Sequence, residues 1–307
     1  MVEFDLRRLR FLREFEERGT LGAVAAALGY SPSAVSQQLA VLEKEVGARL
    51  FEKAGRGVRL TDAGALLARH ARVLLATAEA ATADLAALGD EVRGTVRVSG
   101  LQSAARRLLV PTAARMMAAH PRVRIEVHEL ELEQALPELR LGAIDLVISD
   151  EYDGHPRPRP EGLRFEIVYE EPLRLVLPAS HPLARDGAPV PIAGLRDDVW
   201  IASSAGTGQH LMLVGTCRSL GGYEPDLRHF AYDAEVQLEL VRSTGAIALL
   251  PGLTLPAGDP ALAIRDVAEA SVGRRLAVLT RDGQQAPALT AFLSTVREQA
   301  RALSRDV

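Results

Sequence analysis

Apolar residues recur at helical spacing in three stretches near the start of the chain, and glycines separate these stretches. The first stretch ends at Gly19, where a residue in the left-handed conformation can terminate a helix. Thr20 can cap a short helix over residues 21–28, and Ser31 followed by a proline is typical of the start of a third helix. The pattern therefore predicts three short helices.

The third helix has one apolar side and one polar side. Its apolar residues are Val35, Leu39, Leu42 and Val46, at spacings of four, three and four. Its other side carries Ser33, Ser36 and Gln37. Two short strand-like runs, 49–53 and 58–60, then enclose Arg56 between glycines. These runs are typical of a wing, and residues 1–60 are interpreted as a winged helix-turn-helix domain.

The polar side of the third helix has the chemistry needed to contact DNA. A helix-turn-helix places its second helix in the major groove, where Gln37 can pair with an adenine edge. Ser33 and Ser36 can contact phosphates or bases, and Arg56 can enter a narrow minor groove. The alternative is a three-helix scaffold with an ordinary polar surface.

Residues 61–90 are dominated by alanine and leucine and predict one long helix, with Thr61 as its cap. An apolar seam runs along this helix, formed by Leu66, Leu67, Val73, Leu74, Ala80, Leu85 and Leu88. The seam is too apolar for an isolated rod in water, so the helix is expected to pair with a second copy. The alternative is that the seam packs against the core of its own chain.

Beyond residue 93 the pattern changes to alternating strands and helices. Strands are expected at 95–99, 123–127, 145–149, 165–169, 173–177, 199–202, 227–232, 247–250 and 274–280. Helices are expected at 103–119, 131–141, 206–220, 234–242 and 287–303. This order predicts an α/β domain over residues 94–305. Its first lobe is assigned to about 94–160 and 268–305, and its second lobe to about 163–265, with a cleft between them.

Ligands in open α/β sheets bind beyond the carboxyl ends of the strands. The candidate residues at these ends are Ser99, Gly100, Leu101, Gln102, Ser103, Ser149, Asp150, Ser203, Ser204, Thr207, Tyr232 and Asp233. Hydroxyls and helix amides would suit a small carboxylate or an amino acid, and Asp150 or Asp233 could take an ammonium group. The alternative for each serine is a helix cap or a turn.

Composition narrows the class of protein. The chain has 307 residues, 48% of them hydrophobic, and a formal net charge of −4, so bulk charge does not decide whether it binds DNA. It has no apolar run of about 20 residues and no signal peptide, which predicts a cytoplasmic protein. The single cysteine, Cys217, cannot form an internal disulfide. The sequence shows no catalytic triad, cofactor fingerprint or metal-ligand spacing, so no enzyme, cofactor or metal is expected.

Several motifs together resemble the LysR-type transcriptional regulators. They are the stretch 20–28, Ser-Pro-Ser-Ala-Val-Ser-Gln-Gln-Leu at 31–39, residues 47–51, and Leu-Thr-Asp-Ala-Gly at 60–64. In the second half, Leu-Gly-Ala-Ile-Asp-Leu at 141–146 and His-Pro-Leu-Ala at 181–184 are also similar to that family. Pro32 and Ser33 stand where the family often has Gln-Pro, so the base preference is not carried over.

The resemblance implies an N-terminal winged helix-turn-helix, a linker helix for dimerisation and a two-lobed effector domain like the type 2 periplasmic binding proteins. It implies a dimer or tetramer that binds an inverted-repeat operator in double-stranded DNA and responds to a small molecule. The implied DNA-contacting residues are Ser31, Ser33, Ala34, Ser36, Gln37 and Arg56. The alternative function is a solute-binding module with an accessory helical domain that does not act on DNA.

Overall fold

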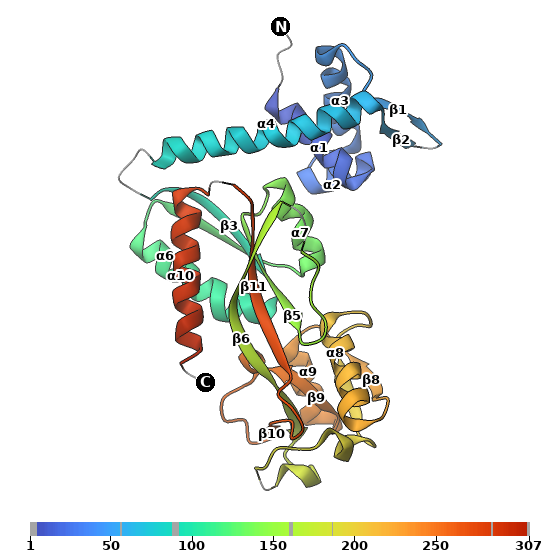
Figure 1. Ribbon diagram of the computed structural model, residues 1–307, viewed down its shortest axis with the longest axis vertical. Coiled ribbons are helices and arrows are strands. Elements are labelled where there is room, and N and C mark those ends of the chain that lie inside the picture. The colour runs from blue at the N-terminus through green and yellow to red at the C-terminus, as the bar shows by residue number, and fades with distance from the viewer. Residues whose placement is uncertain are drawn as a thin grey trace.

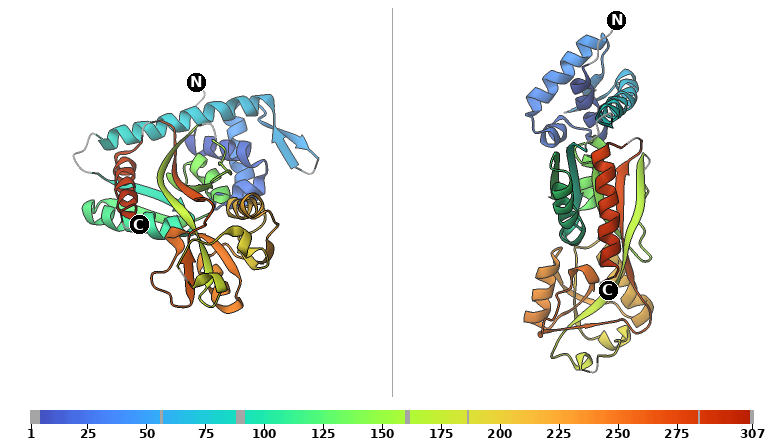
Figure 2. Two further views of the ribbon diagram at one scale, coloured as in Figure 1. Left: turned by 60° about the horizontal axis from the view of Figure 1, so that its bottom comes forward. Right: turned by 90° about the vertical axis from the view of Figure 1, so that its left-hand side faces the viewer.

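The computed structural model describes residues 5–55, 57–87, 92–159, 162–185, 187–283 and 285–305. A small helical head and a long helix lie at one end of the molecule, and an α/β domain extends away from them (Figure 1). A view from the side shows the head, the first lobe and the second lobe following one another along the long axis (Figure 2).

The head contains the helices and the hairpin that the sequence predicts. They are α1 (Leu6–Arg18), α2 (Leu21–Leu28), α3 (Pro32–Val46), β1 (Phe51–Ala54) and β2 (Gly57–Leu60). The first three helices end at Gly19, Gly29 and Gly47, each with a φ near +70° that a residue with a side chain rarely adopts. The hydroxyls of Thr20 and Ser31 cap the second and third helices, as expected.

The long helix α4 (Asp62–Ala87) has two apolar faces. One face carries Leu67, Ala68, Ala71 and Leu75, which are buried, and the first three of them belong to the core of the head. The other face leaves Leu66 50% and Val73 64% exposed, and Leu85, near the end of the helix and five turns beyond Leu67, is 68% exposed. The assignment of Leu67 to the intermolecular seam was therefore wrong, because this side chain packs inside its own head. Leu88 lies outside the described residues.

The α/β domain is built on one sheet that continues through both lobes. Within the described residues its strand order is β4-β3-β5-β11-β6-β9-β7-β8, with β10 paired to β6. The strands are β3 (Gly94–Gly100), β4 (Val123–Glu129), β5 (Leu146–Tyr152), β6 (Leu163–Pro178), β7 (Val199–Ala202), β8 (Asp226–Phe230), β9 (Ile247–Pro251), β10 (Leu262–Arg265) and β11 (Gly273–Arg281). In each lobe three strands run parallel, and β6 and β11 run antiparallel to their neighbours.

Helices cover this sheet and form the core of each lobe. They include α5 (Gln102–Ala104), α6 (Val110–Ala119), α7 (Leu132–Leu141) and α10 (Pro287–Leu303) in the first lobe, and α8 (Gly208–Thr216) and α9 (Ala234–Thr244) in the second. Further helical segments, of three to five residues each, are η1 (Ala105–Leu109), η2 (Pro182–Ala184), η3 (Ile192–Leu195), η4 (Cys217–Gly221) and η5 (Gly252–Thr254). Phe292 of α10 is a large side chain of the first-lobe core, and Trp200 has the same role in the second. No helix of the described ranges is both long and apolar enough to cross a membrane.

The structure corrects the expected boundary between the lobes. The runs 165–169 and 173–177 were expected to be separate strands, but they form the single strand β6. The first part of β6 pairs with β11, and the second part pairs with β9 and β10. Tyr169 packs in the first-lobe core and Leu173 in the second, so the chain crosses between them and not at residue 163. Pro172, which has no N–H to donate, lies where the strand changes partners.

Gly64 permits the close contact between α4 and the chain that leads into the wing. A Cβ atom at this position would lie 2.2 Å from the carbonyl oxygen of Leu50, which is backbone and cannot rotate away. We expect Gly64→Ala to lower the free energy of unfolding of the head by about 1–3 kcal/mol through overpacking. Thermal unfolding of the purified protein measures this change.

Gly22→Ala is the matched control, because a Cβ at Gly22 would meet nothing within 4 Å. Alanine is the better helix former by about 0.8–1 kcal/mol, so this variant should be as stable as the parent or more stable. If Gly64→Ala proves as stable as Gly22→Ala, the proposed packing of α4 on the wing is wrong.

Candidate functional site

The N-terminal part of α3 forms an exposed polar edge. Ser33, Ser36 and Gln37 are exposed, Ala34 is half-buried, and Val35 underneath them is fully buried. Ser31 is also exposed, but its Oγ already accepts a hydrogen bond from the amide of Ala34 at 3.2 Å and lies 2.9 Å from the Oγ of Ser33. The structure thus brings together five of the six expected DNA-contacting residues, and Arg56 lies outside the described residues.

Basic residues of the head differ in their availability. Arg59 pairs with Glu52 at 2.7 Å, and Arg8 pairs with Glu45. Arg49 and Lys53 are exposed and have no carboxylate partner within the part of the chain that the structure describes. These two positive charges of the head can therefore contact phosphates without breaking an ion pair of the protein.

A cavity of about 730 Å³ lies between the two lobes. Seven of the twelve expected ligand residues line it: Leu101, Gln102, Ser103, Asp150, Ser203, Thr207 and Tyr232. The others, Ser99, Gly100, Ser149, Ser204 and Asp233, are not among its lining residues.

The residues that miss the cavity do so for simple geometric reasons. Side chains alternate between the two faces of a strand, so Ser149 is buried in the sheet while its neighbour Asp150 points to the cavity. Ser99 is fully buried within β3. The backbone of Gly100 faces Ile148 and Leu109, and a side chain there would be crowded by the core.

A buried ion pair lies beside the cavity, where the chain crosses between the lobes. Arg274 of β11 is 2% exposed, and its Nε donates to Glu171 of β6 at 2.9 Å. It also donates to the hydroxyl of Ser103 at 3.0 Å and lies 3.8 Å from Asp150. The second oxygen of Glu171 accepts the amide of Leu253 at 2.6 Å. One arginine of β11 thus connects strands β5 and β6 and helix α5.

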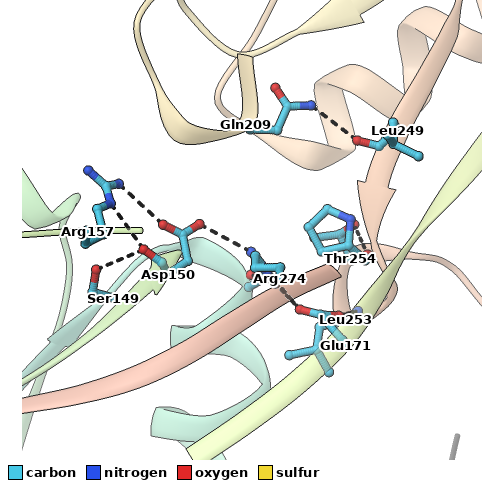
Figure 3. A network of polar contacts seen from close by, with 11 residues as sticks. Ser149, Asp150, Arg157, Glu171, Gln209, Leu249, Leu253, Thr254 and Arg274 are labelled. Atoms are coloured by element: carbon cyan, nitrogen blue, oxygen red, sulfur yellow. Dashed lines mark hydrogen bonds and ion pairs between the residues drawn. The ribbon is translucent and has the colours of Figure 1, made fainter. Parts of the chain in front are cut away.

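Asp150 stands between two arginines, as Figure 3 shows. Arg157 lies 3.4 Å from its carboxylate and donates to its carbonyl oxygen at 3.1 Å. The other end of the Arg157 guanidinium pairs with Glu133 at 2.7 Å. The proline-rich loop that carries Arg157 supplies a wall of the cavity.

Burial and neighbouring charge fix the protonation states at this site. Burial opposes a charge on Arg274, but the carboxylates of Glu171 and Asp150 outweigh it and raise the pKa of Arg274 above its ordinary value. Burial, and then the charge of Asp150, raise the pKa of the Tyr152 hydroxyl. Arg274 is therefore a permanent cation, and Tyr152 stays a neutral phenol at physiological pH.

Gln102 joins the lobes across the mouth of the cavity. Its amide nitrogen donates to Asp233 at 2.7 Å, and its amide oxygen accepts the backbone N–H of Ala234 at 3.4 Å. Asp233 was expected to contact a ligand, but its carboxylate caps α9 and holds Gln102. Arg106 and Glu235, 3.2 Å apart, add a second contact between the lobes.

Sequence reasoning missed several residues that line the cavity. They are Glu129, Glu131, Glu133, Gln134, Tyr152, Arg157, Gln209, Gln237, Thr254 and Arg274. A signal was present for Arg274, because an arginine close to the apolar run 276–279 of a strand needs a partner wherever the fold buries it. The helix and loop residues gave no comparable signal, since charges there are usually solvated.

Comparisons with known proteins agree with this architecture. The model described as the bacterial regulatory helix-turn-helix protein, lysR family, matches residues 6–65, and the LysR substrate binding domain matches residues 89–301. The two matches span the head and both lobes. The chain belongs to the LysR family of transcriptional regulators.

Individual relatives cover most of the same architecture. A probable hydrogen peroxide-inducible genes activator of Mycobacterium xenopi is 34% identical over 179 residues, which are 58% of this chain and 92% of that protein. The transcriptional dual regulator GltC of Bacillus subtilis is 26% identical over 261 residues, 85% of each chain. A full-length OxyR variant from Pseudomonas aeruginosa shares the fold with a TM-score of 0.67 at 18% identity, over 97% of this chain and 95% of that one.

The buried ion pair gives a testable stability effect. Arg274→Met leaves the carboxylate of Glu171 buried without its cation, so the free energy of unfolding should fall by about 3–5 kcal/mol. Arg297→Met removes an ion pair with Glu166 on the surface, where both side chains are about half exposed. This substitution should change the free energy of unfolding by about 1 kcal/mol or less. Urea denaturation of both variants makes the comparison. Equal losses in the two variants would show that the Arg274 pair is solvated.

Proposed function

We propose that this regulator binds a small effector between its two lobes and transmits the binding to its DNA-reading head through α7. The observation that carries this proposal is the position of that helix. Glu133 and Gln134, at its beginning, line the cavity, and Glu138, further along it, pairs with Arg18 of α1 at 2.9 Å. A ligand that moves the start of α7 therefore moves a residue in contact with the head.

Arg18, the partner of Glu138, is held in place by a second ion pair within the head. The Nε of Arg18 donates to Glu14 at 3.1 Å, and the Glu14 side chain is fully buried. Burial of Glu14 raises its pKa, but Arg18 and Arg13 oppose this change. A shift of Glu138 would thus pull on Arg18, a residue of α1 that Glu14 anchors within the head. The ligand biases the equilibrium only by its different affinities for the two lobe arrangements.

On the DNA side, we assign the reading edge to Ser31, Ser33, Ala34, Ser36 and Gln37, with Arg56 in the wing. The exposure of the α3 edge supports this assignment, since its polar groups are not used up by the core. The exposed apolar face of α4 supports pairing between two chains, which would place two heads on an inverted repeat. Such a regulator would act in the cytoplasm and perform no catalysis.

Gln37→Ala tests the reading edge. Loss of a bidentate base contact should weaken binding to the specific operator by about 1–3 kcal/mol and relax the preference at one base pair. A gel-shift titration on the DNA beside the chain's own gene, with scrambled DNA as competitor, measures both effects.

Gln299→Ala is the same substitution on α10 and should bind the operator like the parent. Equal affinity of the parent and Gln37→Ala would refute the contact. If the parent itself showed no preference among DNA sequences, the alternative of a solute-binding module without DNA function would be favoured.

The names of several relatives refer to hydrogen peroxide. In this chain the environment of Cys217 argues against hydrogen peroxide as the signal that the regulator senses. This cysteine is the single one of the chain, and its side chain is fully buried in the second-lobe core. Burial raises the pKa of its thiol to about 11. Peroxide reacts with an accessible thiolate, so Cys217 has neither the exposure nor the charge for it.

We therefore expect hydrogen peroxide to leave operator binding unchanged. In the folded protein iodoacetamide should alkylate Cys217 slowly, and in guanidinium chloride rapidly, as mass spectrometry would report. A peroxide-dependent change in the gel shift that Cys217→Ser abolishes would contradict this expectation.

A further inference from the structure

The cavity between the lobes has an excess of negative charge. Glu129, Glu131, Glu133 and Asp150 line it, against the two cations Arg157 and Arg274. Glu171, immediately behind Arg274, adds another carboxylate to the same region. A ligand entering this space meets a negative potential.

Both arginines of the cavity are already neutralised by carboxylates of the protein. Arg274 holds Glu171 at 2.9 Å, and Arg157 holds Glu133 at 2.7 Å. Asp150 lies within 4 Å of both guanidinium groups. An effector carboxylate would have to displace one of these partners and leave it without a cation. The arginines therefore act as internal counter-ions and not as an anion clamp.

Glu131 makes no ion pair of this kind within the described residues. It lies at the start of α7 and lines the cavity, and its side chain makes no capping hydrogen bond. Its exposed side chain also makes no other hydrogen bond in the described part of the chain. Partial desolvation by the cavity wall, and then the charges of Asp150 and Glu133, raise its pKa, although Arg157 acts in the opposite direction. This carboxylate would be stabilised by a cation bound in the cavity.

A second, independent group on the other lobe also lacks a donor. Gln237 of α9 lines the cavity and is only 2% exposed. Its amide nitrogen donates to the carbonyl of Ala231 at 2.7 Å, but its amide oxygen has no hydrogen-bond partner in the described structure. A buried acceptor left unpaired is costly, and a donor group on a ligand would satisfy it.

We propose that the effector carries a protonated nitrogen, an ammonium or guanidinium group, which Glu131 binds in the cavity, with Gln237 as a further acceptor. This inference rests on the proposed function and names the chemical class of its ligand. The sequence predicts a small carboxylate or an amino acid; of these, the amino acid supplies the ammonium group that fits these charges, and a simple carboxylate does not.

A series of probes matched in length separates the charge classes. Agmatine and lysine carry a cationic end, whereas adipate carries two carboxylates and no nitrogen. Thermal unfolding of the full-length protein is followed with each probe at millimolar concentration. We expect agmatine or lysine to raise the Tm in a concentration-dependent way, and adipate to do so weakly or not at all.

Glu131→Gln keeps the size of the side chain and removes its charge at an exposed position, so folding should be preserved. It should weaken binding of the cationic probe about tenfold. The control Glu224→Gln neutralises an exposed carboxylate outside the cavity and should leave probe binding unchanged.

Three results would each overturn the inference. Adipate could stabilise the protein where the cations do not, the cations could leave the Tm unchanged, or the parent and Glu131→Gln could bind the cation equally well. Operator binding is measured on the same preparation by gel shift. If DNA binding persists, only the ligand class has failed. If the parent binds no operator, the proposed function fails and the inference falls with it.

Discussion

The whole arrangement depends on one helix that has to bury apolar residues in two directions. The face of α4 that carries Leu67 and Ala71 completes the core of the head, whereas the face that carries Leu66 and Val73 stays exposed in the single chain, as does Leu85 near the end of the helix. Twenty-six residues give α4 a length of about 39 Å, so its exposed residues offer a surface long enough for a second copy. Burial of that surface between two copies would stabilise the pair and fix the distance between their heads.

The effector domain adds a second constraint, because only a few segments connect its lobes. β6 and β11 pass from one lobe to the other, and the buried pair of Glu171 and Arg274 joins them near the crossing. Gln102 bridges the lobes on the cavity side. In the proposed function, closure around a ligand would rotate the lobes about these strands, and α7 would carry the movement toward Arg18 of the head. The proposal thus couples the pocket and the head through one helix.

Local chemistry determined what could be predicted from the sequence. Gly19, Gly29 and Gly47 end helices because their backbone adopts positive φ, and such signals depend only on neighbouring residues. The polar edge of α3 followed from helical periodicity alone. The rule that ligands bind beyond the carboxyl ends of strands correctly predicted part of the cavity lining, including Ser103, Asp150 and Thr207.

What could not be predicted depends on contacts between distant segments. Arg274 and Glu171 meet only because two strands pair in one register, and Gln237 reaches the cavity only because the lobes face each other. The continuity of β6 was hidden by Pro172, which reads as an interruption until its position at a change of strand partners is known.

Sedimentation velocity on the full-length protein tests the central claim most directly, with the parent compared with a variant carrying both Leu66→Glu and Val73→Glu. Both side chains are at least half exposed, so each chain should still fold, while two charges on the seam prevent its burial. The account predicts a dimer or larger assembly for the parent at micromolar concentration and a monomer, or a strongly weakened assembly, for the variant. A monomeric parent, or a variant that assembles like it, would contradict the account.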